Sequence, residues 1–279
     1  MRMFNIPNLF TAANLMCGVL SIILTFAGRI DLAPFAIFLG GIFDFFDGFL
    51  ARKLKVSGEM GKQLDSLADM VTFGLAPGFL MMVVIIVSIY IDVPYEATNF
   101  ASHVHFELQN WMNAIFYNVP NQMDAPIKWL PLFALVIPFF SMFRLAKFNL
   151  DTRQSESFIG VPTPLNTIFF TFFPLIMWME FDTWRYDEGI FAYLFNSYFL
   201  IGLCVFMSLL LVSELKLFSL KFKHFKWKGN EIRFVFLLIS MILIPTLLVW
   251  SIPLIVFLQL ILSLVDNLLF KNKQHEIQS

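Results

Sequence analysis

Four aspartates at helical spacing offer the plainest chemistry in this sequence. Asp44 and Asp47 are three residues apart, and Asp65 and Asp69 are four apart, so each pair falls on one face of a helix. Both pairs border long apolar stretches, where an ionised carboxylate costs roughly 3 kcal/mol even on mild scales. A cation, a partner group or a water-filled cavity normally offsets such a cost. The four aspartates therefore indicate a functional site.

Ligands that are all oxygen select a hard divalent cation. Carboxylates suit Mg²⁺ or Mn²⁺, and four can hold two ions of the kind that clamp both oxygens during a displacement at phosphorus. On the same helix, Gly48 and Ala51 would let a flat group approach the backbone, and Arg52 could face a phosphate. The alternative is solvated carboxylates at helix ends, which suits Asp65 and Asp69 near a helix N-terminus. Both pairs together with their flanking residues favour the metal site.

Long apolar spans must position these aspartates. Of the 279 residues, 58% are hydrophobic and 14% are charged, whereas a soluble domain has about a quarter charged residues. Reading for spans of about 20 apolar residues gives 9–27, 33–54, 64–91, 129–148, 166–179, 198–212, 233–249 and 252–270. The sequence thus predicts an all-α, polytopic integral membrane helix bundle of about eight transmembrane helices in one membrane domain, 1–279.

The basic residues predict how the bundle is oriented. Of the 19 Lys and Arg residues, all but Arg29, Lys128 and Arg185 fall on one side of the predicted spans. Because basic loops remain cytoplasmic, both termini and the four aspartates are predicted at the cytoplasmic face of the cell membrane. The site would then be open to cytosolic small molecules and to lipids of the inner leaflet.

The remaining features predict little chemistry. The outer loop, 92–128, carries apolar residues at helical spacing, including Trp111 and Ile115, which suits a short interfacial helix. His103 and His105 have no third ligand nearby, so no metal is assigned to them. No nucleic-acid partner is expected.

The spacing of the acidic motif matches a known signature. The chain reads Asp44-x₂-Asp47-Gly48-x₂-Ala51-Arg52-x₈-Gly61-x₃-Asp65-x₃-Asp69, which resembles the signature of the CDP-alcohol phosphotransferase family of integral membrane enzymes. The resemblance implies transfer of a substituted phosphate from a CDP-linked donor to an alcohol, with release of CMP. It also implies metal binding, with two ions, by Asp44, Asp47, Asp65 and Asp69, a general-base role for Asp69, and CDP contacts from Gly48, Ala51, Arg52 and Gly61.

Further segments resemble the phosphatidylserine synthase branch of that family. They are 73–77, 143–149, 158–164 and 211–213, and the resemblance covers most of a core at about 4–220. A basic loop and two C-terminal transmembrane helices would make up 221–279. The branch implies CDP-diacylglycerol and L-serine as substrates and a homodimer as the assembly.

The acceptor alcohol is less well specified by the sequence. Arg144 and Lys147, one helical turn apart, are candidates for the serine carboxylate or a lipid phosphate, although basic residues there could simply anchor the helix. With Arg153, they could instead serve glycerol 3-phosphate or inositol phosphate, because a second phosphate needs clustered cations. A divalent-cation transporter is a rival of another class, but it would need polar pathways to both sides.

Overall fold

The computed structural model describes residues 5–56, 58–89, 99–117, 127–151, 158–180, 189–218, 227 and 230–278. The elements in chain order are α1 (Ile6–Phe26), α2 (Ala33–Lys53), α3 (Glu59–Asp69), η1 (Met70–Leu75), α4 (Ala76–Ile89), α5 (Phe100–Phe116), η2 (Ile127–Leu135), α6 (Val136–Leu150), β1 (Phe158–Ile159), α7 (Thr163–Met179), α8 (Gly189–Leu194), α9 (Ser197–Val212), β2 (Lys216–Leu217), α10 (Glu231–Leu247), η5 (Leu248–Trp250) and α11 (Ser251–Gln278).

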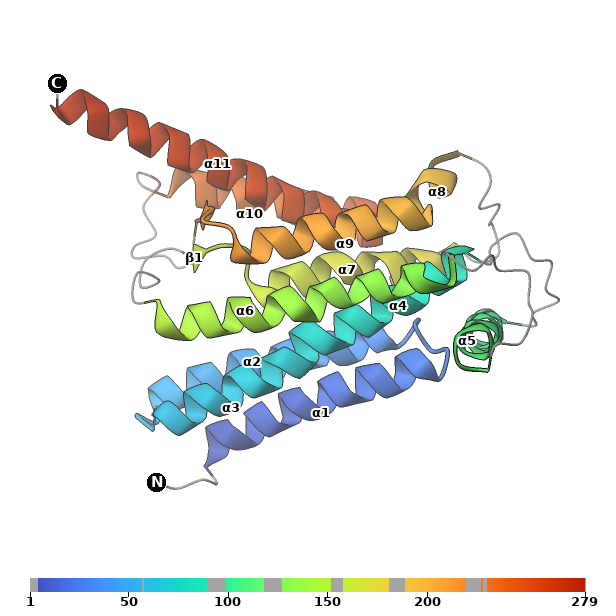
Figure 1. Ribbon diagram of the computed structural model, residues 1–279. Coiled ribbons are helices and arrows are strands. Elements are labelled where there is room, and N and C mark those ends of the chain that lie inside the picture. The colour runs from blue at the N-terminus through green and yellow to red at the C-terminus, as the bar shows by residue number, and fades with distance from the viewer. Residues whose placement is uncertain are drawn as a thin grey trace.

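The predicted all-α membrane bundle is confirmed (Figure 1). Within the described residues, the helical runs long and apolar enough to cross a membrane are Ile6–Phe26, Ala33–Lys53, Glu59–Ile89, Lys128–Leu150 and Glu231–Leu268. The last run contains both α10 and α11, which pack against each other on either side of the η5 turn, where Leu248 has a φ of 47°. With the shorter helices α7 and α9, each of the eight predicted spans overlaps a helical segment.

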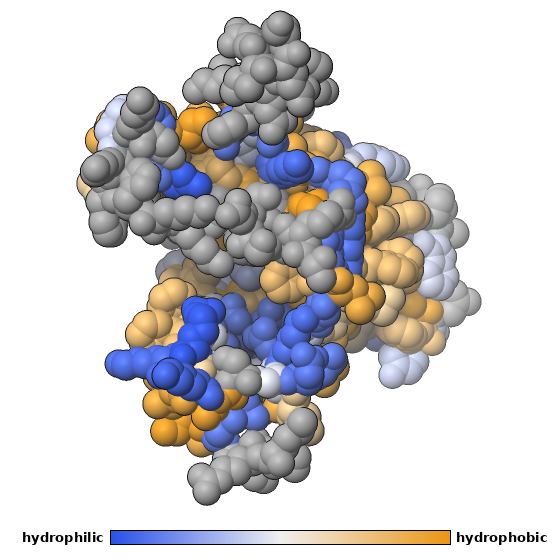
Figure 2. Space-filling model, turned by 90° about the vertical axis from the view of Figure 1, so that its left-hand side faces the viewer, coloured by the Kyte–Doolittle hydropathy of each residue, from blue (hydrophilic) through white to orange (hydrophobic). Residues whose placement is uncertain are grey.

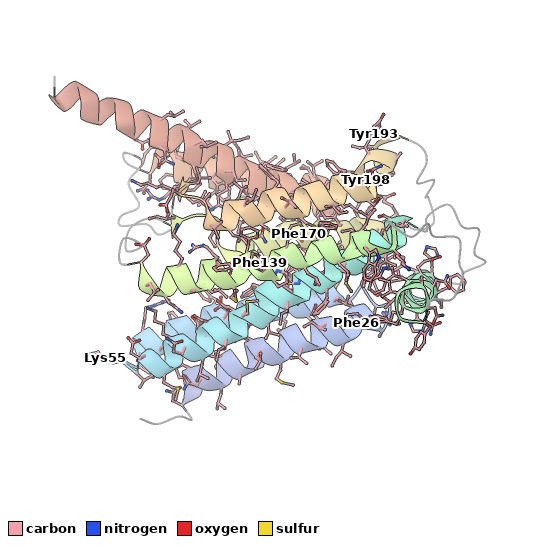
Figure 3. All side chains as sticks on the ribbon, in the orientation of Figure 1. Phe26, Lys55, Phe139, Phe170, Tyr193 and Tyr198 are labelled. Carbon is pink, nitrogen blue, oxygen red and sulfur yellow. The ribbon has the colours of Figure 1, made fainter. Side chains whose placement is uncertain are left out.

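The two ends of the bundle differ in character. Helix α1 begins and α11 ends at the same end, as an even number of spans requires (Figure 1). Lys55 lies at that end, whereas Phe26, Tyr193 and Tyr198 lie at the opposite end (Figure 3). Helix α5 lies across this second end, so the outer loop contains a helix, as predicted. Aromatic side chains are typical of the membrane–water interface.

Helix α4 forms the centre of the core. Its residues 80 to 87 are at most 3% exposed, and it packs against α1, α7, α9 and η2. Four Phe side chains of α7, at 169, 170, 172 and 173, are also buried. By contrast, α1 and α2 bury only one third of their apolar windows and α10 with α11 about one tenth. The outer helices therefore present apolar side chains for contact with lipid.

A break in regular helix geometry lies where the site is built. Helices α3 and α4 are joined by η1, a π-helical turn that directly follows Asp69. Added Cβ atoms at Gly18 and Gly40 would come within 2.9 Å of Thr72 in this turn, so these two glycines allow α1 and α2 to approach it closely. Turns of this type are often found at functional sites.

Candidate active site

The ends of α2 and α3 bring three of the four predicted aspartates together. Carboxylate oxygens of Asp44, Asp47 and Asp65 all lie within 4.8 Å of one another. Asp47 is buried, and Asp44 and Asp65 are half-buried. Asp69 lies one turn further along α3 than Asp65 and is not part of this close group. The close group thus contains three of the four predicted aspartates, and the fourth follows one helical turn later on α3.

Helix α1 supplies contacts that the motif did not reveal. Thr11 donates its hydroxyl to Asp47 Oδ2 at 2.6 Å, and Asn14 Nδ2 donates to Asp69 Oδ1 at 3.1 Å. Both α1 side chains are buried, Asn14 completely. A hydrogen bond to a charged group contributes about 1.5–3 kcal/mol. The two bonds fix the carboxylate of Asp47 in the close group and the carboxylate of Asp69 one turn beyond it.

Helix α1 lies beside both helices that carry the aspartates. It packs along α2 and α3, and its polar face contacts the aspartates of each. Thr72 in η1 donates to the carbonyl oxygen of Asn14 at 2.9 Å, which ties α1 to the turn after Asp69. The first span therefore belongs to the site.

A pocket of about 270 Å³ opens beside two of the close carboxylates, those of Asp47 and Asp65. It is lined by Pro7, Asn8, Thr11, Asp47, Gly48, Ala51, Arg52, Val56, Gly58, Gly61, Lys62 and Asp65. All four residues predicted to contact CDP are in this lining. An added Cβ at Gly61 would meet only Asn8 Oδ1, at 3.6 Å, so this glycine leaves space in the pocket. Figure 2 shows hydrophilic side chains gathered at this end of the molecule.

The donor atoms fit a hard divalent cation. Three carboxylates present oxygen atoms within a few ångströms of one another, and in the described structure the buried Oδ1 of Asp65 has no hydrogen-bond partner. Bare carboxylates at such separations repel one another. Mg²⁺ and Mn²⁺ prefer such oxygen ligands. The residues present are therefore suited to an ion of this class.

The two candidate acceptor residues have different environments. Arg144 is 3% exposed, donates from Nε to the carbonyl oxygen of Val161 at 3.1 Å, and lies over the ring of Phe148. Lys147 is more exposed and pairs with Glu214 at 2.5 Å. Arg153 lies outside the described residues. A buried guanidinium is the more selective of the two cations, because its planar fork can pair bidentately with a carboxylate.

The comparison with known protein families agrees with this arrangement. A model of the CDP-alcohol phosphatidyltransferase family matches residues 4–210, which include α1 to α8 and most of α9. The chain belongs to this family. Helices α10 and α11 lie beyond the matched region.

Curated relatives of this family member carry more specific names. This chain is 32% identical over 177 residues to the CDP-diacylglycerol–serine O-phosphatidyltransferase of Bacillus subtilis. The match covers 62% of this chain and 79% of the relative. The chain is 27% identical to the enzyme of the same name from Helicobacter pylori, over 86% of this chain and 82% of the relative. The archaetidylserine synthase of Methanothermobacter thermautotrophicus is 27% identical over 58% of this chain and 54% of the relative.

Proposed function

We propose that this protein transfers the phosphatidyl group of CDP-diacylglycerol to the hydroxyl of L-serine, releasing CMP and forming phosphatidylserine. The observation that carries the proposal is the three-carboxylate group of Asp44, Asp47 and Asp65, of which Asp47 and Asp65 line the pocket. Family membership supports phosphatidyl transfer from a CDP-linked donor. The names of the relatives support serine as the acceptor.

In this proposal the pocket holds the CDP part of the donor. Gly61 leaves room for the nucleotide beside α3, and Arg52, whose guanidinium lies against Gly48, would face the phosphates. Divalent ions, Mg²⁺ or Mn²⁺ and two in number, would be held by Asp44, Asp47, Asp65 and Asp69 and would neutralise the pyrophosphate. Thr11 fixes the Asp47 carboxylate so that it does not rotate away from this group.

Asp69 is the proposed general base. It would accept the proton of the serine hydroxyl as the hydroxyl oxygen bonds to the phosphorus of the phosphatidyl group and the bond from that phosphorus to CMP breaks. Asn14 holds its carboxylate in place. A position one turn from the close carboxylates suits this role, because the acceptor oxygen must approach opposite the leaving group.

The acceptor side and the topology complete the proposal. Arg144 would bind the serine carboxylate, and its burial favours it over Lys147, which already pairs with Glu214. The site would face the cytoplasm, as the basic residues at the same end of the bundle indicate. We propose a homodimer as the assembly.

The test is CMP release by the detergent-purified protein. CDP-diacylglycerol is supplied with Mg²⁺ or Mn²⁺, and L-serine, glycerol 3-phosphate or inositol phosphate is added singly. We expect release that depends on serine and stops on addition of EDTA. Release stimulated only by a phosphorylated acceptor would overturn the serine assignment, and no release with any acceptor would overturn phosphatidyl transfer itself.

A further inference from the structure

Three buried polar side chains lie on α6 and in the first turn of α7, two helices that both pack against η1. Asn166 and Ser141 are completely buried, and Arg144 is 3% exposed. Within the described part of the chain, neither side-chain polar atom of Asn166 has a hydrogen-bond partner, and the same holds for Ser141 Oγ and Arg144 Nη1. Buried polar groups are almost always paired in folded proteins. Their accumulation here indicates that a small polar molecule satisfies them.

The packing of α6 places this group beside Asp69. Asn149 Nδ2 donates to Ser66 Oγ at 2.7 Å, and an added Cβ at Gly74 would lie 3.2 Å from Ser141 Cβ. Helix α6 therefore runs antiparallel to α3 and η1, with residue 149 beside 66 and residue 141 beside 74. In this register Arg144 stands beside residue 71, only about 3 Å along the helix axis from Asp69 at 1.5 Å per residue.

Helix α7 brings Asn166 to the same level. Thr167 donates its hydroxyl to the carbonyl oxygen of Phe73 at 2.9 Å, so the first turns of α7 lie against η1. Val161, which accepts the Arg144 Nε hydrogen bond, precedes α7 by two residues. Gly160 fixes this segment, because its φ is 79° and a Cβ there would lie 2.5 Å from the carbonyl oxygen of Leu211.

The chemistry of the three side chains matches an amino acid better than a phosphate ester. Arg144 Nη1 can donate to a carboxylate, while Asn166 Oδ1 and Ser141 Oγ can accept from an ammonium group. A dianionic phosphate needs two or three cations. Among the described side chains at this level, Lys147 pairs with Glu214 and Lys62 donates to the carbonyl oxygen of Asn149, which leaves Arg144 with an unused charged donor.

We infer that Ser141, Arg144 and Asn166 form a pocket for a zwitterionic amino-acid acceptor, in which Arg144 holds the carboxylate and Asn166 with Ser141 holds the ammonium group. The inference rests on the proposed phosphatidyl transfer and adds the residues that select the acceptor. It makes Asn166 a specificity-determining residue. A water-filled cavity is the competing explanation for the same unpaired atoms.

The test compares acceptor and donor kinetics in the full-length protein. Asn166→Ala and Ser141→Ala are assayed for CMP release, with Ser208→Ala as the matched control. Ser208 is also a completely buried serine whose hydroxyl has no partner in the described structure, but it lies on α9. We expect the KM for serine to rise about tenfold or more in Asn166→Ala, with the KM for CDP-diacylglycerol within about twofold of wild type. Ser141→Ala should show a smaller rise and Ser208→Ala no change.

A serine analogue separates binding of the ammonium group from general distortion. 3-Hydroxypropionate keeps the carboxylate and hydroxyl but lacks the amino group, and its inhibition constant against serine is measured. We expect this constant to be unchanged in Asn166→Ala and raised in Arg144→Gln. An equal loss of affinity for serine and 3-hydroxypropionate in Asn166→Ala would overturn the assignment.

The outcomes also separate this inference from the proposed function. If wild-type protein transfers to serine but Asn166→Ala and Ser141→Ala keep the wild-type KM for serine, only the pocket is refuted and its atoms are satisfied by water. If the wild-type protein transfers to no acceptor, the proposed function itself is wrong. A KM for CDP-diacylglycerol within about twofold of wild type confirms in each variant that the donor side remains folded.

Discussion

Replacing Asn14 by alanine tests whether α1 takes part in catalysis. The substitution removes the Nδ2 hydrogen bond to Asp69 Oδ1 (3.1 Å) from a side chain that is completely buried. A hydrogen bond to a charged group contributes about 1.5–3 kcal/mol, and each 1.36 kcal/mol in the barrier changes the rate tenfold. If the bond is needed in the transition state, Asn14→Ala should lower kcat by about 10- to 150-fold.

The assay is initial-rate CMP release at saturating CDP-diacylglycerol, serine and divalent ion. The loss should appear in kcat, with the KM for the donor close to wild type, because Asn14 does not line the nucleotide pocket. Ser21→Ala is the control, since Ser21 is a completely buried α1 residue whose hydroxyl has no partner in the described structure. Wild-type kcat in Asn14→Ala, or the same loss in Ser21→Ala, would refute a specific role for the Asn14–Asp69 contact.

Three further predictions address metal affinity, the donor pocket and the outer helix. Thr11→Val removes the 2.6 Å hydrogen bond to Asp47 and should raise the Mn²⁺ concentration for half-maximal activity about tenfold, whereas an unchanged ion requirement would contradict the role given to Thr11. Gly61→Val adds side-chain atoms to the pocket wall and should raise the KM for CDP-diacylglycerol without changing that for serine; equal changes in both would show distortion instead. In α5, burial raises the pKa of Glu107 from 4.5 to about 7, so between these values the folded protein holds a proton that the unfolded chain has lost, and stability falls as pH rises. The melting temperature of Glu107→Gln minus that of wild type should therefore grow from pH 4.5 to about 7. A difference that stays constant over this range would contradict the raised pKa of the Glu107 carboxyl.

Much of the fold could be predicted because membrane burial leaves a strong signal in sequence. A span of about 20 apolar residues is hard to place anywhere but in a bilayer, so all eight predicted spans overlap helices. The π-helical turn after Asp69 was not predicted. It depends on close packing of Thr72 against Gly18 and Gly40, which lie far away in sequence on two other helices.

The same contrast holds for the site. The sequence could predict that Asp44, Asp47 and Asp65 lie close together. Helical spacing places the two aspartates of each pair on a shared face, and a short connection joins the two helices. Thr11 and Asn14 could not be assigned in this way, because their contacts depend on how α1 packs against both helices. A usable signal was present nonetheless, since two polar residues three apart in an apolar span indicate a polar helix face.

The most direct measurement is the transfer of radiolabelled L-serine into lipid by the purified protein with CDP-diacylglycerol and Mn²⁺, compared between wild type, Asp47→Ala and Asp69→Asn. The account predicts labelled phosphatidylserine and an equal amount of CMP from the wild type, with loss of both products in the two variants. Label in lipid at the wild-type rate with either aspartate replaced, or CMP release from the wild type without any label in lipid, would contradict it.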